Sequence, residues 1–316
     1  MIQHDTNKLK NDTASGRGLG QGGYISGNRS NEIVYITIST TGNTSDFGDL
    51  TNVRTGMGMT ASTTRAVSNG GYESGANEFI NTIEYVTIAT TGDSADFGNT
   101  TYTAQATAAT GNSTRGLPLG GNIDGGIRRN EINYVTIATL GDATDFGNLT
   151  AAKNSVAAGG SPTRGIIGGG YTGSKTDVIE FISLASTGDG ADFGDLTDAR
   201  TTVAPTGNGT RACFMIGNVS PAAAYDSNVI DFVTIATTGN ATDFGDASDT
   251  RDQGQRGSMS TNTRGILMGG SRLGHVNIIE YITIPTRGNV TDFGDLNVAA
   301  YDKGTTSNSH GGLQSS

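Results

Sequence analysis

The sequence predicts an all-β fold built from six similar units, and two observations lead to this prediction. First, an Asp-Phe-Gly triplet recurs six times, at intervals of 47 to 51 residues. The triplets start at Asp46, Asp96, Asp145, Asp192, Asp243 and Asp292. Second, an aromatic residue in a β-branched run precedes each triplet phenylalanine by twelve residues, as Phe181 precedes Phe193. A fixed internal spacing indicates one supersecondary unit used six times, and a period of ~50 residues is typical of β-propellers.

Each unit is predicted to contain four short strands. The first begins at an arginine and ends at a glycine pair, as in residues 164–170, because paired glycines permit positive φ at a strand end. The second is the β-branched run, as in residues 178–184, which is apolar on both faces and should be covered on both. The third carries the triplet phenylalanine after a turn rich in Gly, Asp and Asn. A weaker fourth strand is expected before the next arginine, for example over residues 101–108 and 199–205.

The two ends of the repeat region are predicted to complete one blade between them. The region begins at a glycine-ended strand, residues 17–23, and ends at residues 297–307, which match the weak fourth strand. Pairing of these segments would satisfy the strand edges that an open array leaves exposed. The predicted fold is therefore a six-bladed β-propeller with four-stranded antiparallel blades, closed by pairing the C-terminal strand with the N-terminal blade.

Composition and self-similarity favour one repeat array over ordinary domains. The 316 residues include 49 glycines, 5 prolines and no tryptophan, which alone leans toward low complexity, but the regular apolar strands argue against disorder. We divide the chain into an N-terminal arm, residues 1–15, and a propeller, residues 16–316. The arm is polar and matches no part of the repeat, so it should become ordered only against another surface.

Charge and apolar patterning exclude several classes of partner. The net charge of −10, with acids spread through every repeat, disfavours nucleic acid, which requires a basic stripe. No apolar run approaches the ~18 residues of a membrane span, and the N-terminus lacks the core of a signal peptide. The single cysteine, Cys213, cannot form an internal disulfide and is expected to be a small core residue, which suits folding in a reducing cytoplasm.

The segment after each glycine pair varies most in length, and equivalent loops of a repeat array lie on one face, where recognition is usual. Tyrosine and arginine are frequent at interface hot spots. The predicted partner-binding residues are Tyr24, Arg29, Tyr72, Phe79, Arg128, Arg129, Tyr171, Lys175, Tyr225, Arg272 and His275. The alternative is that they are merely solvated loop positions.

The arginine that opens each unit is expected to be structural, because packing shared by every unit explains a residue present in every unit. These arginines are Arg17, Arg65, Arg115, Arg164, Arg211 and Arg264. A bidentate link between strands, or to an aspartate of a neighbouring blade, suits guanidinium geometry. The alternative is that they line a channel for an anionic ligand.

No catalytic, cofactor-binding or metal-binding set is predicted. Asp-Phe-Gly is also the magnesium-binding triplet of protein kinases, but the other kinase motifs are missing. Acids beside the triplet, such as Asp142 and Asp145, would suit Ca²⁺, and the alternative is that they accept backbone N–H bonds in tight turns. His4, His275 and His310 are far apart in sequence and indicate neither a zinc site nor a catalytic triad.

The repeat resembles that of kelch-type β-propellers. The family repeat has a strand ending in Gly-Gly, a strand aromatic, a second aromatic that is normally tryptophan, and an arginine. Gly169, Gly170, Phe181, Phe193 and Arg200 take those places here. This resemblance implies four-stranded blades around a central axis.

Two features depart from the kelch pattern. Phenylalanine replaces the tryptophan in all six copies, and the Arg200 position holds Gln105, Lys153, and Tyr301 or Ala300 in other units. These departures weaken the assignment to the kelch family itself and leave the propeller prediction unchanged.

The repeat is also similar, over residues 17 to about 312, to repeats of virion proteins from marine and cyanobacterial tailed phages. That resemblance implies a non-enzymatic structural or recognition protein of a tailed-phage virion, with the tail as the favoured location: a fibre, an adhesin, or a baseplate or tail decoration. The implied partners are other virion proteins and a host-surface receptor or glycan, with the protein in multiple copies and folded in the host cytoplasm. No cofactor, nucleic-acid partner or membrane insertion is expected. Alternatives are a capsid decoration protein, a carbohydrate-binding or carbohydrate-processing propeller, and a cellular kelch adaptor.

Overall fold

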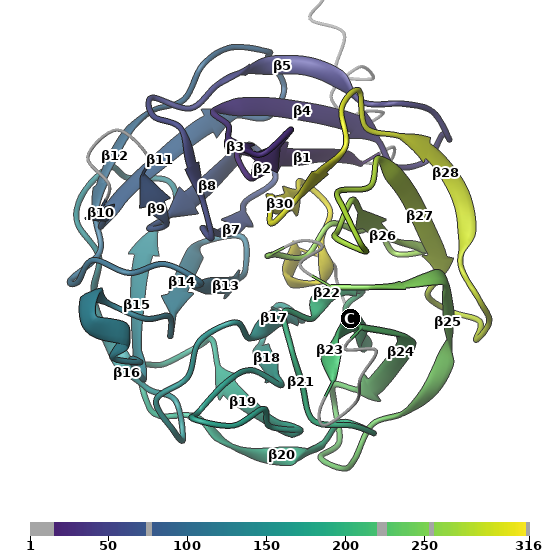
Figure 1. Ribbon diagram of the computed structural model, residues 1–316. Coiled ribbons are helices and arrows are strands. Elements are labelled where there is room, and N and C mark those ends of the chain that lie inside the picture. The colour runs from purple at the N-terminus through teal and green to yellow at the C-terminus, as the bar shows by residue number, and fades with distance from the viewer. Residues whose placement is uncertain (1–15, 74–77, 220–225, 253–255, 314–316) are drawn as a thin grey trace, which may run out of the picture.

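The protein is an all-β molecule in which six larger antiparallel sheets stand side by side around a common centre (Figure 1). The computed structural model describes residues 16–73, 78–219, 226–252 and 256–313. Each sheet corresponds to one predicted unit, and its strands follow one another from the centre outward. The predicted N-terminal arm lies outside the described residues.

The first four sheets have four strands each, as predicted. The first sheet consists of β30 (Gly304–Ser307), β1 (Arg17–Gln21), β4 (Glu32–Thr37) and β5 (Ser45–Asp49). The second consists of β7 (Gly58–Ala61), β8 (Arg65–Asn69), β11 (Thr82–Thr87) and β12 (Ala95–Asn99). The third consists of β13 (Ala108–Gly111), β14 (Arg115–Leu119), β15 (Glu131–Thr136) and β16 (Thr144–Asn148). The fourth consists of β17 (Ala157–Gly160), β18 (Arg164–Gly168), β19 (Val178–Ser183) and β20 (Ala191–Asp195).

The last two sheets depart from four equal strands. The fifth consists of β22 (Ala204–Gly207), β23 (Arg211–Val219), β24 (Asp226–Thr234) and β25 (Thr242–Arg251), with β21 (Arg200–Thr201) also paired to β23. The sixth has three strands, β26 (Arg264–Met268), β27 (Ile278–Thr283) and β28 (Thr291–Asp295). In place of its innermost strand, Ser260 forms a single bridge with Gly265, and the amide of Ile266 donates to the carbonyl of Met259.

In the second to fifth units, the fourth strand lies later in the chain than the sequence suggested. It directly precedes the opening arginine as a short innermost strand, such as β13 or β22, and pairs with the arginine strand through a tight turn. The predicted ranges 101–108 and 199–205 mostly cover the link between sheets. Small residues obscured the strand in the sequence, because β13 is Ala-Ala-Thr-Gly and β17 is Ala-Ala-Gly-Gly, with no large apolar side chain.

The predicted pairing of the chain ends is confirmed. β30 pairs antiparallel with β1, from Gly18 opposite Ser307 to Gln21 opposite Gly304. The C-terminal segment also replaces the tight turn that precedes the opening arginine in other units. Asn308 Oδ1 accepts a 2.8 Å hydrogen bond from the Arg17 amide, as Asn112 Oδ1 accepts from the Arg115 amide within the third sheet. The first sheet is therefore assembled from both ends of the described chain.

All six triplet phenylalanines are buried, each 2% exposed, as predicted. Each packs edge-on against the strand aromatic twelve residues before it, with ring centroids 5.7 to 6.2 Å apart. Each also packs against the following sheet. Phe193 of the fourth sheet shares a core cluster with Val233 and Ile235 of the fifth, and Phe293 of the sixth shares one with Ile36 of the first.

The glycine of the triplet allows neighbouring sheets to touch through their backbones. A Cβ on Gly48 would lie 2.5 Å from the carbonyl oxygen of Gly92, which belongs to a turn of the second sheet, and the φ of Gly48 is 150°. The amide of Gly92 donates to the carbonyl of Phe47 at 2.7 Å. The equivalent bond joins every sheet to the next, and Gly42 of the first sheet donates to Phe293 of the sixth at 2.8 Å.

The aspartates and asparagines of the same turns accept backbone N–H bonds from the neighbouring sheet. This is the role that the sequence analysis gave as the alternative to calcium binding. Asp142 Oδ1 accepts from the amide of Asn99 in the preceding sheet at 2.9 Å, and Asn43 Oδ1 accepts from Asp295 at 3.0 Å. Among the described residues no group of three or more His, Cys, Asp or Glu is placed to hold a metal ion.

The six opening arginines are structural, but the predicted carboxylate is not their partner. Each lies over the strand aromatic of its own sheet, with Arg65 4.4 Å from the ring centroid of Tyr85. Its guanidinium donates to a carbonyl of the next sheet, as Arg65 does to Ile137 at 2.7 Å and Arg264 of the sixth sheet does to Ile38 of the first at 3.0 Å. Carbonyls at the ends of the β-branched strands are the nearest acceptors, and the buried carboxylates pair with other cations.

Buried ion pairs between the links and the following sheets form a second set of contacts. The cation lies seven residues after the triplet phenylalanine, and the acid lies on the second strand of the next sheet. The pairs are Arg54 with Glu84, Lys153 with Glu180, Arg200 with Asp231, and Arg251 with Glu280. Burial lowers the pKa of Arg200, and the charge of Asp231 opposes that shift.

The structure corrects the sequence alignment at this cation position. The equivalents of Arg200 in the links that enter the third and first sheets are Ala104 and Ala300. The predicted Gln105 lies one residue further along, and of the two residues predicted for the other link, Ala300 is the equivalent and Tyr301 is not. The acid is also missing in both places, since Asn133 and Val34 occupy its position. Cation and acid are therefore present or absent together. Lys303, three residues after Ala300, instead pairs with Glu32 at 3.3 Å.

Cys213 is a small core residue, as predicted. It is fully buried in the fifth sheet, in one cluster with Met215 and Phe244, and burial raises the pKa of its thiol to about 12.

Candidate recognition face

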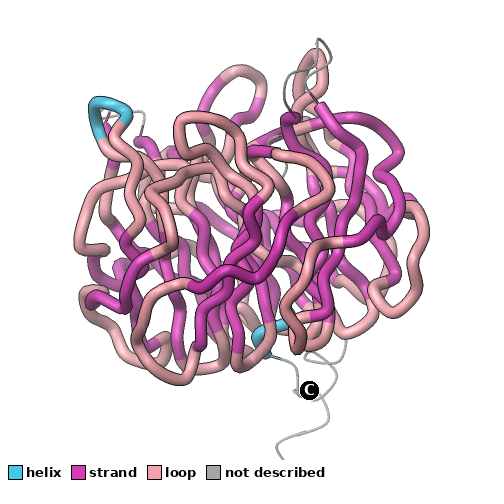
Figure 2. The backbone as a smooth tube through the Cα atoms, turned by 90° about the horizontal axis from the view of Figure 1, so that it is seen from below, coloured by secondary structure: helices cyan, strands magenta, loops and turns pink. Residues whose placement is uncertain are grey.

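The variable loops emerge on one face of the molecule, here called the loop face. Every such loop joins the first and second strands of a unit, so all of them leave the sheets at the same end. Figure 2 shows η1 (Asp124–Gly126), which belongs to the third loop, on the side opposite η2 (Gly311–Leu313) near the C-terminus. The tight turns and the described ends of the chain lie on that opposite side, here called the turn face.

Each loop is a hairpin whose first residue pairs with the link that enters its sheet. Two of these pairings form small sheets: β29 (Ala300–Tyr301) with β2 (Tyr24–Ile25) and β3 (Asn28–Arg29), and β6 (Arg54–Thr55) with β9 (Tyr72–Glu73) and β10 (Glu78–Phe79). The others are bridges or the ends of β21, β23 and β24. The six first hairpin residues are Tyr24, Tyr72, Asn122, Tyr171, Asn218 and Ser271. This pairing fixes the base of each loop to the adjacent link.

The last paired residue of each hairpin lies opposite the first and is here called the closing residue. The closing residues are Arg29, Phe79, Arg128, Lys175, Asp226 and His275. All six are structurally equivalent, because each pairs antiparallel with the first residue of its own hairpin. Five of the eleven predicted partner-binding residues are closing residues, and three are first residues.

Closing residues reach the next hairpin around the loop face. The Arg29 guanidinium lies 4.3 Å from the ring centroid of Tyr72, and that of Arg128 lies 5.2 Å from the ring of Tyr171. Lys175 donates to the side-chain oxygen of Asn218. These pairs join hairpins that are more than 40 residues apart in sequence, and cation–π contacts of this kind add stability at partly exposed sites.

The last hairpin contacts the first through an aromatic cluster. His275 packs edge-on against Tyr301, with ring centroids 4.6 Å apart, and Tyr301 stacks on Tyr24 at 5.2 Å and 7°. Sequence reasoning missed Tyr301 because it belongs to a link and not to a loop. The signal that could have found it is its position eight residues after the triplet phenylalanine Phe293, where every unit pairs with its hairpin.

An acidic group lies beside this cluster and was also missed. Asp252 pairs with Ser271, and its pKa is raised to about 7 by burial, then by the charges of Asp226 and Asp302. Arg256 opposes that shift and forms an ion pair with Asp302. The loop face therefore mixes cations, acids and aromatic rings.

The remaining predicted residues have separate surroundings. Arg129 pairs with Glu131 and lies 5.2 Å from the ring centroid of Tyr102, so it acts within its own unit. Arg272 is exposed and pairs with Asp249. Tyr225 lies outside the described residues.

Large apolar side chains are exposed at the tips of two hairpins, and the sequence analysis missed both. Ile127 is 58% exposed beside η1, and Leu273 is fully exposed with a φ of +48°, which is uncommon for leucine. Tyr171 is 37% exposed between them in chain order. These large side chains face solvent, although polar residues alone could form a solvated loop.

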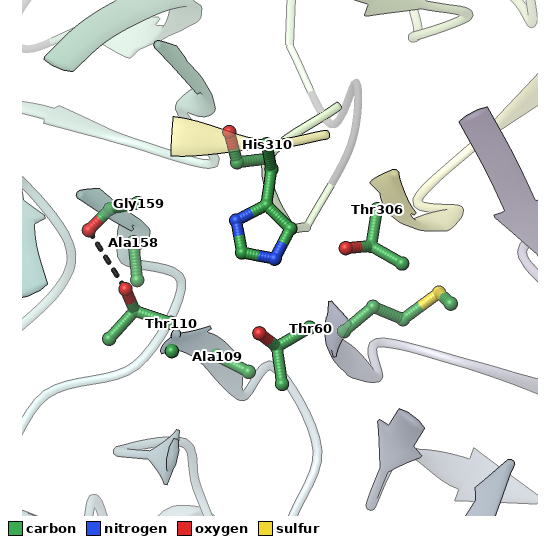
Figure 3. A pocket seen from close by; sticks show the side chains of 10 residues that line it. Thr60, Ala109, Thr110, Ala158, Gly159, Thr306 and His310 are labelled. Atoms are coloured by element: carbon green, nitrogen blue, oxygen red, sulfur yellow. Dashed lines mark hydrogen bonds between the residues drawn. The ribbon is translucent and has the colours of Figure 1, made fainter. Parts of the chain in front are cut away.

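The centre of the molecule holds a small cavity on the axis, shown in Figure 3. Its volume is about 10 Å³, and it is lined by Thr60, Thr110 and Thr306 from three innermost strands and by His310. The hydroxyls of Thr60 and Thr306 are buried and have no hydrogen-bond partner among the described residues. The space suits about one water molecule and excludes an organic ligand.

The C-terminal segment covers the centre of the molecule on the turn face. His310 Nε2 lies 2.9 Å from the carbonyl of Ala61, and its Nδ1 accepts from the amide of Gly312 at 3.1 Å. A Cβ on Gly312 would lie 1.9 Å from the carbonyl oxygen of Gly111, so only glycine fits there. Since Nδ1 accepts a hydrogen bond, the buried imidazole is neutral and donates through Nε2.

We expect His310 to make stability fall in acid. Burial lowers the pKa of His310 to about 4 from an ordinary 6.5, so the unfolded chain binds the proton more readily. The free energy of unfolding should decline as the pH falls from 6.5 toward 4, by up to about 3 kcal/mol from this group. Because Asp252 changes stability in the opposite direction over this range, the measurement is urea unfolding of the wild type minus that of His310→Gln. A difference that does not change with pH would contradict this assignment.

No protein-family model matches this chain, and no curated protein shows significant sequence similarity to it. No helix among the described residues has the length and apolar character needed to cross a membrane.

Proposed function

We propose that the six sheets form a closed, six-bladed, kelch-like β-propeller. Three sets of contacts support closure, since each joins the sixth sheet to the first, and the first two sets also join every other pair of neighbouring sheets. They are the arginine bond from Arg264 to Ile38, the turn bond from Gly42 to Phe293, and the loop contact of His275 with the Tyr24 and Tyr301 cluster. The paired absence of cation at Ala300 and acid at Val34 is consistent with the same neighbours.

We further propose that this propeller is a non-enzymatic structural or recognition protein of a tailed-phage virion, associated with the tail and binding other virion proteins or a host-surface receptor through its loop face. The phage assignment rests on the resemblance of the repeat. The binding assignment rests on one observation: hairpins fixed to the sheets present Ile127, Tyr171 and Leu273 to solvent. Apolar groups held on a fixed scaffold lose little conformational entropy on binding.

The test removes these three side chains together. The variant carries Ile127→Ser, Tyr171→Ser and Leu273→Asn, with asparagine chosen because it tolerates positive φ. Since all three are exposed, the melting temperature should change little, whereas incorporation into particles or attachment to host cells should be lost. The matched control is Leu140→Ser, which removes a 57% exposed side chain from a turn on the turn face and should leave both activities intact. Normal incorporation and attachment by the triple variant would refute binding through the loop face.

A further inference from the structure

Four of the six closing residues are cationic or imidazole side chains: Arg29, Arg128, Lys175 and His275. Each contacts a first hairpin residue of the following unit. The loop face thus has a repeated cation position, at which a closing residue contacts the first residue of the following hairpin. At this position, Arg29 and Arg128 each place a guanidinium over a tyrosine ring.

The second unit lacks the cation. Its closing residue is Phe79, which pairs with Tyr72 in the backbone and packs edge-on against its ring, with centroids 5.4 Å apart. Phe79 carries no charge, and the first residue of the third hairpin is Asn122, which has no ring for a cation to stack on. Among the residues that the structure describes, no cation–π contact between the second and third hairpins corresponds to that of Arg29 with Tyr72.

A cavity of about 440 Å³ lies at this place. It is lined by Tyr72, Glu78, Phe79, Thr103 and Asp124, which belong to the described ends of the second hairpin, to the link and to η1 of the third loop. The carboxylates of Glu78 and Asp124 are both exposed, and neither forms an ion pair with a residue that the structure describes. Two aromatic rings and two carboxylates are the surroundings that a bound guanidinium prefers, since it stacks on rings and pairs with carboxylates through its planar fork.

We propose that this cavity binds the guanidinium of an arginine on a partner polypeptide, between the two aromatic rings and the two carboxylates. The occupant is a cation by charge complementarity, because the cavity holds two carboxylates and the protein carries a net charge of −10. It is a guanidinium because a planar cation can stack on the rings of Tyr72 and Phe79 while it donates to the carboxylates. This inference deepens the proposed loop-face recognition and rests on it for the identity of the partner as a protein.

The fifth unit also lacks a cationic closing residue, but it does not offer the same site. Its closing residue is Asp226, which accepts a hydrogen bond from Asn218 in its own hairpin, and no ring stands at the first position. The second unit is thus distinguished by its aromatic pair together with the cavity.

The test uses the full chain and three small probes. N-acetyl-arginine amide is titrated and followed by NMR shifts of the protein, with its uncharged isostere N-acetyl-citrulline amide and with N-acetyl-lysine amide as comparisons. We expect saturable binding of the arginine probe with a dissociation constant of the order of 1–10 mM, as suits one charged group on a partly exposed site. The citrulline probe should not saturate, and the lysine probe should bind several-fold more weakly. Equal binding of all three probes, or no saturation by the arginine probe, would overturn the proposal.

Variants locate the site. Glu78→Gln combined with Asp124→Asn should weaken the arginine probe at least about fivefold, because each carboxylate is a charge-assisted acceptor. Phe79→Arg should abolish binding, since it removes one of the two rings and places a guanidinium of the chain itself at the cavity. Asp292→Asn, an exposed acid on the outer strand of the sixth sheet, is the control for net charge and should leave the affinity unchanged. Unaltered binding by Phe79→Arg would place the probe elsewhere and refute the assignment.

Failure of this inference and failure of the proposed function give different results. If the arginine probe does not bind but the triple loop variant still loses particle incorporation, the loop face recognises its partner by other means. If the probe binds at the cavity while the triple loop variant incorporates normally, the guanidinium site stands and the exposed hairpin tips are not the binding surface.

Discussion

Replacing Arg200 with methionine is expected to lower the free energy of unfolding by about 3–5 kcal/mol. Arg200 and Asp231 are both completely buried, and the pair lies between the link and the fifth sheet. Removal of the guanidinium leaves the Asp231 carboxylate charged in a place that water does not reach. Asp231→Asn should cost a similar amount, since it leaves the guanidinium unpaired. Urea unfolding at neutral pH measures both changes.

The double variant Arg200→Met with Asp231→Asn should be more stable than either single variant. The third unit already contains the uncharged arrangement, with Ala104 and Asn133 in these positions. Asn133 Oδ1 accepts from the amide and hydroxyl of Thr101, as the carboxylate of Asp231 accepts from Thr197. The asparagine therefore keeps the hydrogen bonds while neither charge is left buried. Losses that simply add in the double-mutant cycle would show that the two side chains are not coupled.

The repeated features of the fold were predictable because they recur in the sequence. The spacing of the strand aromatic and the triplet phenylalanine predicted six units and the burial of residues such as Phe193. Features that differ between units were not predictable in the same way. Where the cation of the buried pair is absent, its acid is absent too, as at Ala104 and Asn133. These two positions lie 29 residues apart, so without the sheet register the sequence analysis assigned the cation position to Gln105.

The loop face was predicted in outline and not in detail. Variable length marked the loops, and the structure places the described candidates there. Their mutual contacts depend on neighbours more than 40 residues away, so no local pattern could show that Arg29 lies on Tyr72. Tyr301 and Thr103 were missed because they come from links, which the sequence analysis treated as part of the framework. Ile127 and Leu273 were missed because apolar residues in short loops resemble buried ones until their exposure is known.

Truncation of Phe193 to alanine should lower the free energy of unfolding by about 3–5 kcal/mol. The ring is 2% exposed and fills the space between the fourth and fifth sheets, in contact with residues such as Val233 and Ile235. Alanine would leave a cavity there, because the backbones of the two sheets are held in contact by the turn bond from Gly239 to Phe193 and cannot close around the gap. Chemical denaturation of the purified variant gives the loss directly.

Phe293→Ala extends this measurement to the contact between the sixth and first sheets. In a closed ring Phe293 lies between the sixth and first sheets as Phe193 lies between the fourth and fifth, so the two substitutions should cost the same within about 1 kcal/mol. In an open array the sixth sheet could separate from the first on truncation, and the gap would fill with water at a smaller cost. A loss for Phe293→Ala well below that for Phe193→Ala would therefore contradict ring closure. Equal losses would mean that Phe293 packs against Ile36 and Ile38 of the first sheet as tightly as Phe193 packs against the fifth sheet.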